Sequence, residues 1–139
     1  MKKIFFIYAL LICNIVCFGQ APDWTWAKGA TSVSQTNAYK TVGFGVGIDY
    51  DGNSYVVGRF DSEQIQFGNF TLYGHGNADI FLVKYSPSGG IIWAKNFGGN
   101  NIDLAYSIAV APNGITYITG ETFSDTLNFQ DIELTKKAM

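Results

Sequence analysis

The chain contains two ungapped copies of one pattern, residues 42–72 and 104–134. Apolar character is kept at most aligned places, and several residues are identical. The identical pairs are Gly52/Gly114, Tyr55/Tyr117, Gly58/Gly120, Ser62/Ser124, Phe67/Phe129 and Leu72/Leu134. A repeat of this length is a single supersecondary unit that cannot bury its faces alone and is stabilised by stacking on its neighbours. The sequence therefore predicts stacked repeats rather than one closed domain.

The repeats read as antiparallel β-meanders. Valine, isoleucine, threonine and aromatic residues alternate with small or polar ones, and no helical periodicity follows residue 20. Hairpin turns are expected at 51–53 and 112–114, because glycine and asparagine tolerate the positive φ of tight turns. Strands are expected at residues 42–48, 54–59, 80–85, 91–97, 106–110 and 115–122, and weaker single strands at 65–72 and 127–134.

Two strands carry information about packing. One face of strand 42–48 holds only Gly43, Gly45 and Gly47, and the second copy has Ala105, Ser107 and Ala109 at the same places. Such a face is expected where another sheet approaches closely. Segment 80–83 is apolar on both faces, which predicts cover on both sides.

Four-stranded meanders stacked through small residues on one strand are typical of β-propeller blades. At this level the chain resembles the bacterial β-propeller repeat family called SBBP. The segments that carry the resemblance are residues 79–85, 89–95, 97–99, 107–110 and 113–120. The resemblance implies an exported protein, secreted or held at the outer cell surface, with a role in binding or adhesion.

The chain is short for that family. Trp26-Ala27-Lys28 recurs as Trp93-Ala94-Lys95, so residues 24–28 are expected to be the last strand of a preceding blade. Fewer than two blades remain, whereas a closed propeller needs about four or more. We interpret the sequence as a truncated chain or a disrupted reading frame. The alternative is a short chain that closes a ring by oligomerising.

Residues 1–19 are predicted to be a signal peptide, and residues 20–139 the repeat segment. Lys2 and Lys3 precede an apolar run, residues 4–16, that is too short to span a bilayer, and small residues allow cleavage after Gly19. The competing interpretation of this run is a membrane anchor. Cys13 and Cys17 both lie in the signal, so the mature chain contains no thiol, and export needs no disulfide framework.

Composition also bears on partners. The sequence has a net charge of −2 with its basic residues scattered, so nucleic acid is not an expected partner. No stable membrane span is expected after signal cleavage. We expect a protein or polysaccharide ligand at the cell surface, and self-association through open blade faces.

The sequence offers few candidates for chemistry. Residues 49–53 resemble the start of a calcium loop, but Ala111 and Pro112 replace two of the oxygen ligands in the second copy, and a hairpin turn is the simpler interpretation. His75 lies in a glycine-rich loop and is expected to be solvated. The acid pairs, which could suggest glycoside hydrolysis, are interpreted as surface charge. These pairs are Asp61/Glu63 and Asp131/Glu133.

The glycines of residues 43–47 lack the spacing of a phosphate-binding loop and lie within a strand. Trp26 and Trp93 occupy matching places in the repeat, which favours a role in blade packing. Trp24 and Tyr73 are the candidates for exposed aromatic contacts. We predict no catalytic, cofactor-binding or metal-binding residue, and a non-enzymatic role. The alternatives are a fragment of an extracellular propeller enzyme, such as a carbohydrate-active hydrolase or lyase, and a structural spacer.

Overall fold

The computed structural model describes residues 23–33 and 40–136, and the predicted signal peptide lies outside these residues. Within the described ranges the chain consists of strands and turns, and all strands pair antiparallel, so the predicted all-β class is confirmed. The strands are β1 (Thr31–Val33), β2 (Thr41–Ile48), β3 (Ser54–Phe60), β4 (Gln64–Phe67), β5 (Phe70–Tyr73), β6 (Asp79–Tyr85), β7 (Ile91–Phe97), β8 (Asp103–Val110), β9 (Thr116–Thr122), β10 (Thr126–Phe129) and β11 (Ile132–Thr135).

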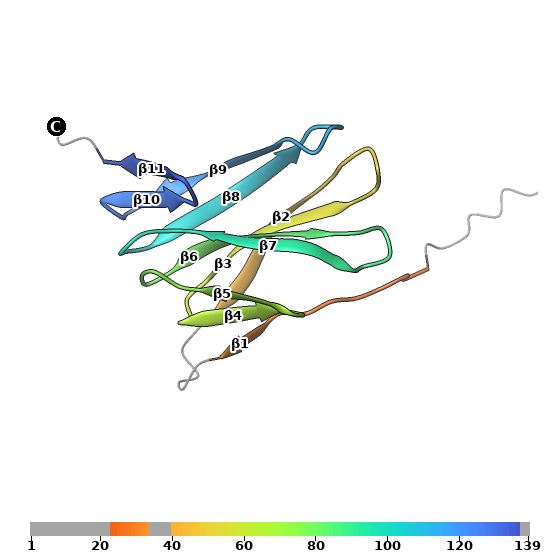
Figure 1. Cartoon of the computed structure of the whole chain (residues 1–139), viewed down its shortest axis with the longest axis horizontal. Helices are drawn as coiled ribbons and strands as arrows, with labels where there is room; N and C mark the ends of the chain where they lie inside the picture. Colours follow the sequence, from red (N-terminus) through yellow and green to blue (C-terminus); the bar gives the residue numbers. More distant parts are fainter. Residues whose placement is uncertain (1–22, 34–39, 137–139) are drawn as a thin grey trace, which may run out of the picture.

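The first unit is a four-stranded sheet in the order β2-β3-β6-β7. Between β3 and β6 the chain forms the hairpin β4–β5, which pairs with β1 to make a separate three-stranded sheet. Figure 1 shows this smaller sheet beside the four-stranded one. The meander is therefore interrupted by a hairpin that covers one of its faces.

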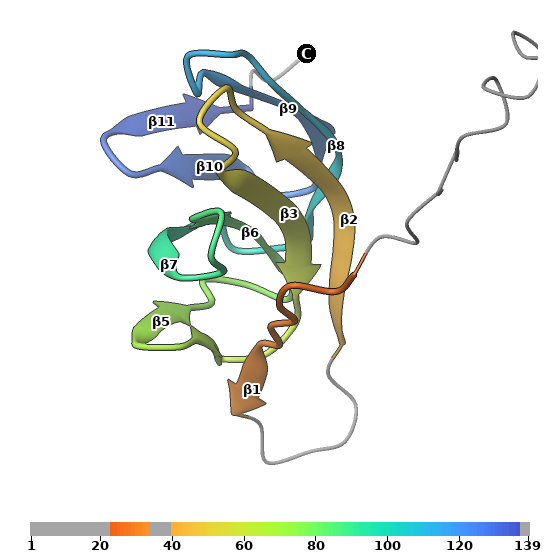
Figure 2. The same cartoon turned by 90° about the vertical axis from the view of Figure 1, so that its right-hand side faces the viewer.

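The second unit repeats the first four strands of the first unit that follow β1, namely β2 to β5. The bounds of β8, β9, β10 and β11 are those of β2, β3, β4 and β5 moved by 62 residues. Even the register shift in β2 between Gly43 and Gly45 recurs in β8 between Ala105 and Ser107. In Figure 2 the hairpin β10–β11 lies above β7, and β5 lies below it. The predicted repeat is thus a structural repeat.

The glycine face of β2 receives the apolar face of β8, as the sequence predicts. A Cβ built on Gly47 would lie 2.5 Å from Cγ2 of Val110, and one on Gly45 would lie 3.0 Å from Cγ2 of Ile108. Backbone hydrogen bonds also join the two units, from Tyr50 to Pro112 at 3.1 Å for example. Small residues on β2 therefore let the two units approach closely.

Gly43 does not belong to this crowded face, contrary to the prediction. A Cβ at Gly43 would meet no atom within 4 Å. The reason is the β-bulge at Phe44, which interrupts the alternation of side chains between Gly43 and Gly45.

Strand β6 is covered on both faces, which confirms the second packing prediction. Phe81 and Val83 pack in one buried cluster, on the side of the hairpin β4–β5. Ile80 and Leu82 pack in another, on the side of the second unit. The Phe81 ring lies 5.0 Å from that of Phe67. This strand is the centre of the core.

The segments 65–72 and 127–134 are hairpins, so the prediction of single strands was wrong. The chain reverses at Gly68, with φ +55°, and at Gln130, with φ +54°. Both residues lie in the left-handed region, which glycine adopts readily and other residues adopt at a cost. The Gly68-Asn69 pair was an available turn signal, but Gln130 conceals the same turn in the second copy.

The prediction of a strand at residues 24–28 was also wrong. Residues 23–30 are extended without strand pairing, and β1 begins only at Thr31. A strand needs a hydrogen-bonded neighbour, and among the described residues none pairs with 23–30. Trp26 instead stacks on Tyr85 with ring centroids 5.5 Å apart, and its Nε1 donates to the Pro87 carbonyl at 3.1 Å.

Gln130→Gly is expected to stabilise the chain by about 0.5–1 kcal/mol. The substitution removes a left-handed non-glycine residue, which costs about 1–2 kcal/mol, but adds flexibility to the unfolded chain. The reverse change at the matching place, Gly68→Gln, should destabilise by a similar amount. Urea denaturation measures both changes in the free energy of unfolding. A destabilised Gln130→Gly variant would show that the backbone of Gln130 is not strained.

Candidate functional site

A cluster of polar side chains surrounds Asp49 at the β2–β3 hairpin. Both carboxylate oxygens accept hydrogen bonds from the side-chain amide of Asn53, at 3.1 and 2.9 Å, and Oδ1 also accepts its backbone N–H. Tyr55 Oη donates to Oδ2 at 3.1 Å, and Lys84 Nζ lies 3.1 Å from the same oxygen. The backbone N–H of Gly52 closes the turn onto the Asp49 carbonyl. The hairpin-turn interpretation of residues 49–53 is confirmed.

These contacts determine the charge of the site. Burial alone would raise the pKa of Asp49, but hydrogen bonds from Asn53, Lys84 and Tyr55 hold its pKa well below the ordinary value. The hydrogen bond with Tyr55 raises the pKa of Lys84, with Asp49 adding to the effect. A cation beside Asp49 would have to displace the Lys84 ammonium. The cluster thus ties β2, β3 and β6 together as a neutral unit, and Ala111 removes it from the second copy.

A second buried carboxylate, Asp79, begins β6. Its Oδ2 accepts the backbone N–H groups of His75, at 2.7 Å, and Gly76, at 3.3 Å. Its Oδ1 has no hydrogen-bond partner among the described residues, although His75 Nδ1 lies 3.8 Å away. Burial raises the pKa of Asp79, against the two backbone hydrogen bonds, and the charge of Asp103 adds to this rise.

Asp79 should make the fold less stable as pH rises. Because its folded pKa lies above the unfolded value of 3.8, its stabilising contribution is complete below about pH 4 and is lost as pH rises through the folded pKa. Asp79→Asn should therefore flatten the fall in unfolding free energy above pH 4. The matched control is His75→Ala, which removes the neighbouring imidazole and keeps the Asp79 carboxyl. An unchanged slope in Asp79→Asn would exclude the carboxyl as its origin.

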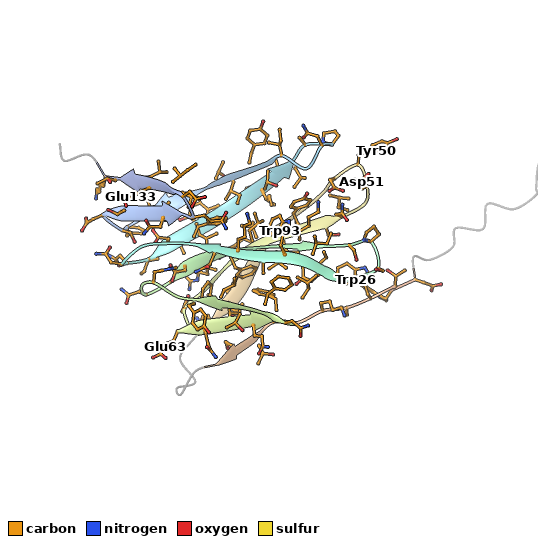
Figure 3. The ribbon with its side chains drawn as sticks, viewed as in Figure 1. Trp26, Tyr50, Asp51, Glu63, Trp93 and Glu133 are labelled. Carbon is orange, nitrogen blue, oxygen red and sulfur yellow. The ribbon has the colours of Figure 1, made fainter. Side chains whose placement is uncertain are left out.

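The structure does not bring the acid pairs together. Asp61 lies 3.4 Å from Arg59 Nε, so its carboxylate neutralises a neighbouring cation. Glu63 and Glu133 lie apart on separate hairpins in Figure 3, and both are exposed. This arrangement agrees with surface charge.

His75 is half exposed, as expected of a solvated loop residue, with Nδ1 3.3 Å from Asn96 Nδ2. The groups that face it are Asn96 and Asp79, and no nucleophile is hydrogen-bonded to its ring in the described ranges.

The aromatic residues divide as the sequence predicts. Trp26 and Trp93 are partly buried, and Trp93 packs edge-on against Tyr55 with centroids 5.8 Å apart. Trp24 is 96% exposed and Tyr73 is 64% exposed. Tyr50, at the hairpin tip in Figure 3, is 87% exposed and was missed as a contact candidate, because its place in a turn gave no packing signal.

The structure also contains an apolar groove that the sequence did not predict. A groove with a volume of about 360 Å³ opens between the two units. Ile80, Leu82 and Phe97 of the first unit line one side, and the other side belongs to the second unit. The residues from that unit include Ile118, Leu127 and Phe129. Sequence periodicity could not reveal this groove, because it depends on how the second unit stacks on the first.

The described residues contain no candidate for a metal site or a membrane-spanning helix. Among them, no three histidine, cysteine, aspartate or glutamate side chains gather closely enough to hold a metal ion. No helix suited to crossing a membrane occurs in residues 23–33 and 40–136.

The chain is similar to an uncharacterised WD repeat-containing protein of Acanthamoeba polyphaga mimivirus, with 31% identity over 98 residues. The match takes in 62% of this chain but spans only 7% of the relative. No family model and no solved structure matches the chain.

WD repeats form propeller blades of four antiparallel strands, which is the strand order β2-β3-β6-β7 of the first unit. The chain is an all-β protein of propeller-blade type. Its described residues form about two repeats, without closing a ring.

Proposed function

We propose that this chain is an exported, non-enzymatic segment of β-propeller repeats, of the bacterial SBBP type. The parent protein binds a protein or polysaccharide at the cell surface. The observation that carries the proposal is the pair of stacked repeats, in which loop N–H groups donate hydrogen bonds to the buried carboxylates of Asp79 and Asp103. Asp103, for example, accepts hydrogen bonds from the Gly99 N–H and the Ser124 hydroxyl. Such acids stabilise turns, which leaves binding to exposed loops and strand edges.

Export has a direct test. N-terminal sequencing of secreted material should begin at Gln20, because small residues at the end of the predicted signal allow cleavage after Gly19. Met1 retained in a membrane fraction would indicate the anchor instead and contradict export.

Binding is tested by incubating the purified chain with cell-surface polysaccharides and proteins. Retention without release of product is expected, and Trp24→Ala should weaken it more than Tyr50→Ala, because Trp24 presents the larger exposed face. Hydrolysis of any polysaccharide in the panel would instead establish an enzyme and overturn the non-enzymatic role.

A further inference from the structure

The two repeats differ at one strand edge. In the first unit β3 lies between β2 and β6, so both of its edges are paired. In the second unit the matching strand, β9, pairs with β8 alone among the described residues. An unpaired edge presents a row of free N–H and C=O groups to an incoming strand.

The groove between the units adjoins this edge. Gly120, Ile118 and Thr116 of β9 line it, together with Leu127 and Phe129. In the first unit the matching surface is formed by Val56, Ile65 and Phe67, which pack against Phe81, Val83 and Tyr85 of β6. The groove of the second unit therefore corresponds to the space that the β6 side chains fill in the first unit.

The contact between Gly58 and Phe81 shows how β6 packs against β3 in the first unit. A Cβ on Gly58 would collide with Cζ of Phe81, so the Phe81 ring lies directly over the glycine. At Gly120 the three nearest atoms belong to the backbone of Leu104 and Ala105, and the residue lines the groove. The place for an aromatic side chain is open.

We propose that the β9 edge and the adjoining groove accept one extended strand of β6 chemistry, presented by another repeat of the same kind. The strand is apolar on both faces and carries an aromatic residue at its third position. By the register of the first unit, Phe81 lies opposite Gly58 and Val83 opposite Val56. The incoming aromatic residue would then lie opposite Gly120, and the following β-branched residue opposite Ile118.

A peptide of residues 78–86 is the probe, added to the purified chain and followed by isothermal titration calorimetry. Saturable one-to-one binding is expected. A Phe81→Ala peptide should bind about tenfold or more weakly, whereas Lys84→Ala should not. Of two peptides N-methylated at alternate residues, one should lose binding and the other retain it, because only one set of N–H groups faces β9.

The chain offers a matched pair of variants on one strand. Ile118→Glu places a charge in the apolar groove and should weaken binding about tenfold or more. Tyr117→Glu should leave binding unchanged, because neighbouring side chains of a strand alternate and Tyr117 lies on the opposite face. If Ile118→Glu fails to fold, the peptide series on the unsubstituted chain still decides the matter.

No saturable binding, or equal loss with both N-methylated peptides, would overturn the proposal. A dimer of the chain could also overturn it. If Ile118→Glu abolishes this dimer but the peptide does not dissociate it, another surface of a second copy occupies the groove.

Discussion

Phe81→Ala is expected to lower the free energy of unfolding by about 3–5 kcal/mol, the usual cost of truncating a buried phenylalanine. Phe81 is 3% exposed, lies over Gly58 and packs against Phe67. Buried side chains from β3, β4, β5 and β6 share its cluster. Chemical denaturation followed by fluorescence or circular dichroism measures the change.

Phe123→Ala is the control for Phe81→Ala. Phe123 is 50% exposed and lies in a loop, so its truncation should cost less than about 1 kcal/mol. Similar losses in the two variants would mean that β6 is not the centre of the core.

The second large effect is expected at Leu72 and is compared with the matching leucine of the second repeat, Leu134. Leu72→Ala should destabilise by about 2–5 kcal/mol, because Leu72 is buried where β5 closes over β6. Leu134→Ala should cost less than about 0.5 kcal/mol, because Leu134 is 54% exposed at the same place in β11.

The difference between the two leucines measures the asymmetry of the repeats. Leucine occupies the same place in both repeats, but among the described residues only the first unit has a strand of β6 type beneath its hairpin. Equal destabilisation by the two substitutions would show that the second hairpin is also covered in solution.

Much of the fold could be predicted from the sequence. Period-two alternation located the principal strands, since side chains on a pleated strand alternate between faces. The glycines of β2 predicted a close approach, and Gly45 and Gly47 make it. The same prediction was wrong for Gly43, because a bulge changes the phase of the alternation. No single residue type signals a bulge of this kind.

The site was less predictable, because its contacts join distant parts of the chain. Asn53 and Tyr55 are close to Asp49 in the sequence, but Lys84 reaches it only after β6 pairs with β3. The groove depends further on the stacking of two units. A pattern of local residues could therefore predict the turn at Asp49 but not its ion pair or the β9 edge.

The close stacking of β8 on the glycine face of β2 is tested most directly by a double-mutant cycle. Gly47→Ala should cost about 1–3 kcal/mol, since its Cβ would lie 2.5 Å from Cγ2 of Val110. Gly43→Ala, in open space, should cost less. In a Val110→Ala background the cost of Gly47→Ala should fall by about 1 kcal/mol, because the colliding methyl group is gone. Costs that add to within about 0.5 kcal/mol would contradict the stacking of the two repeats.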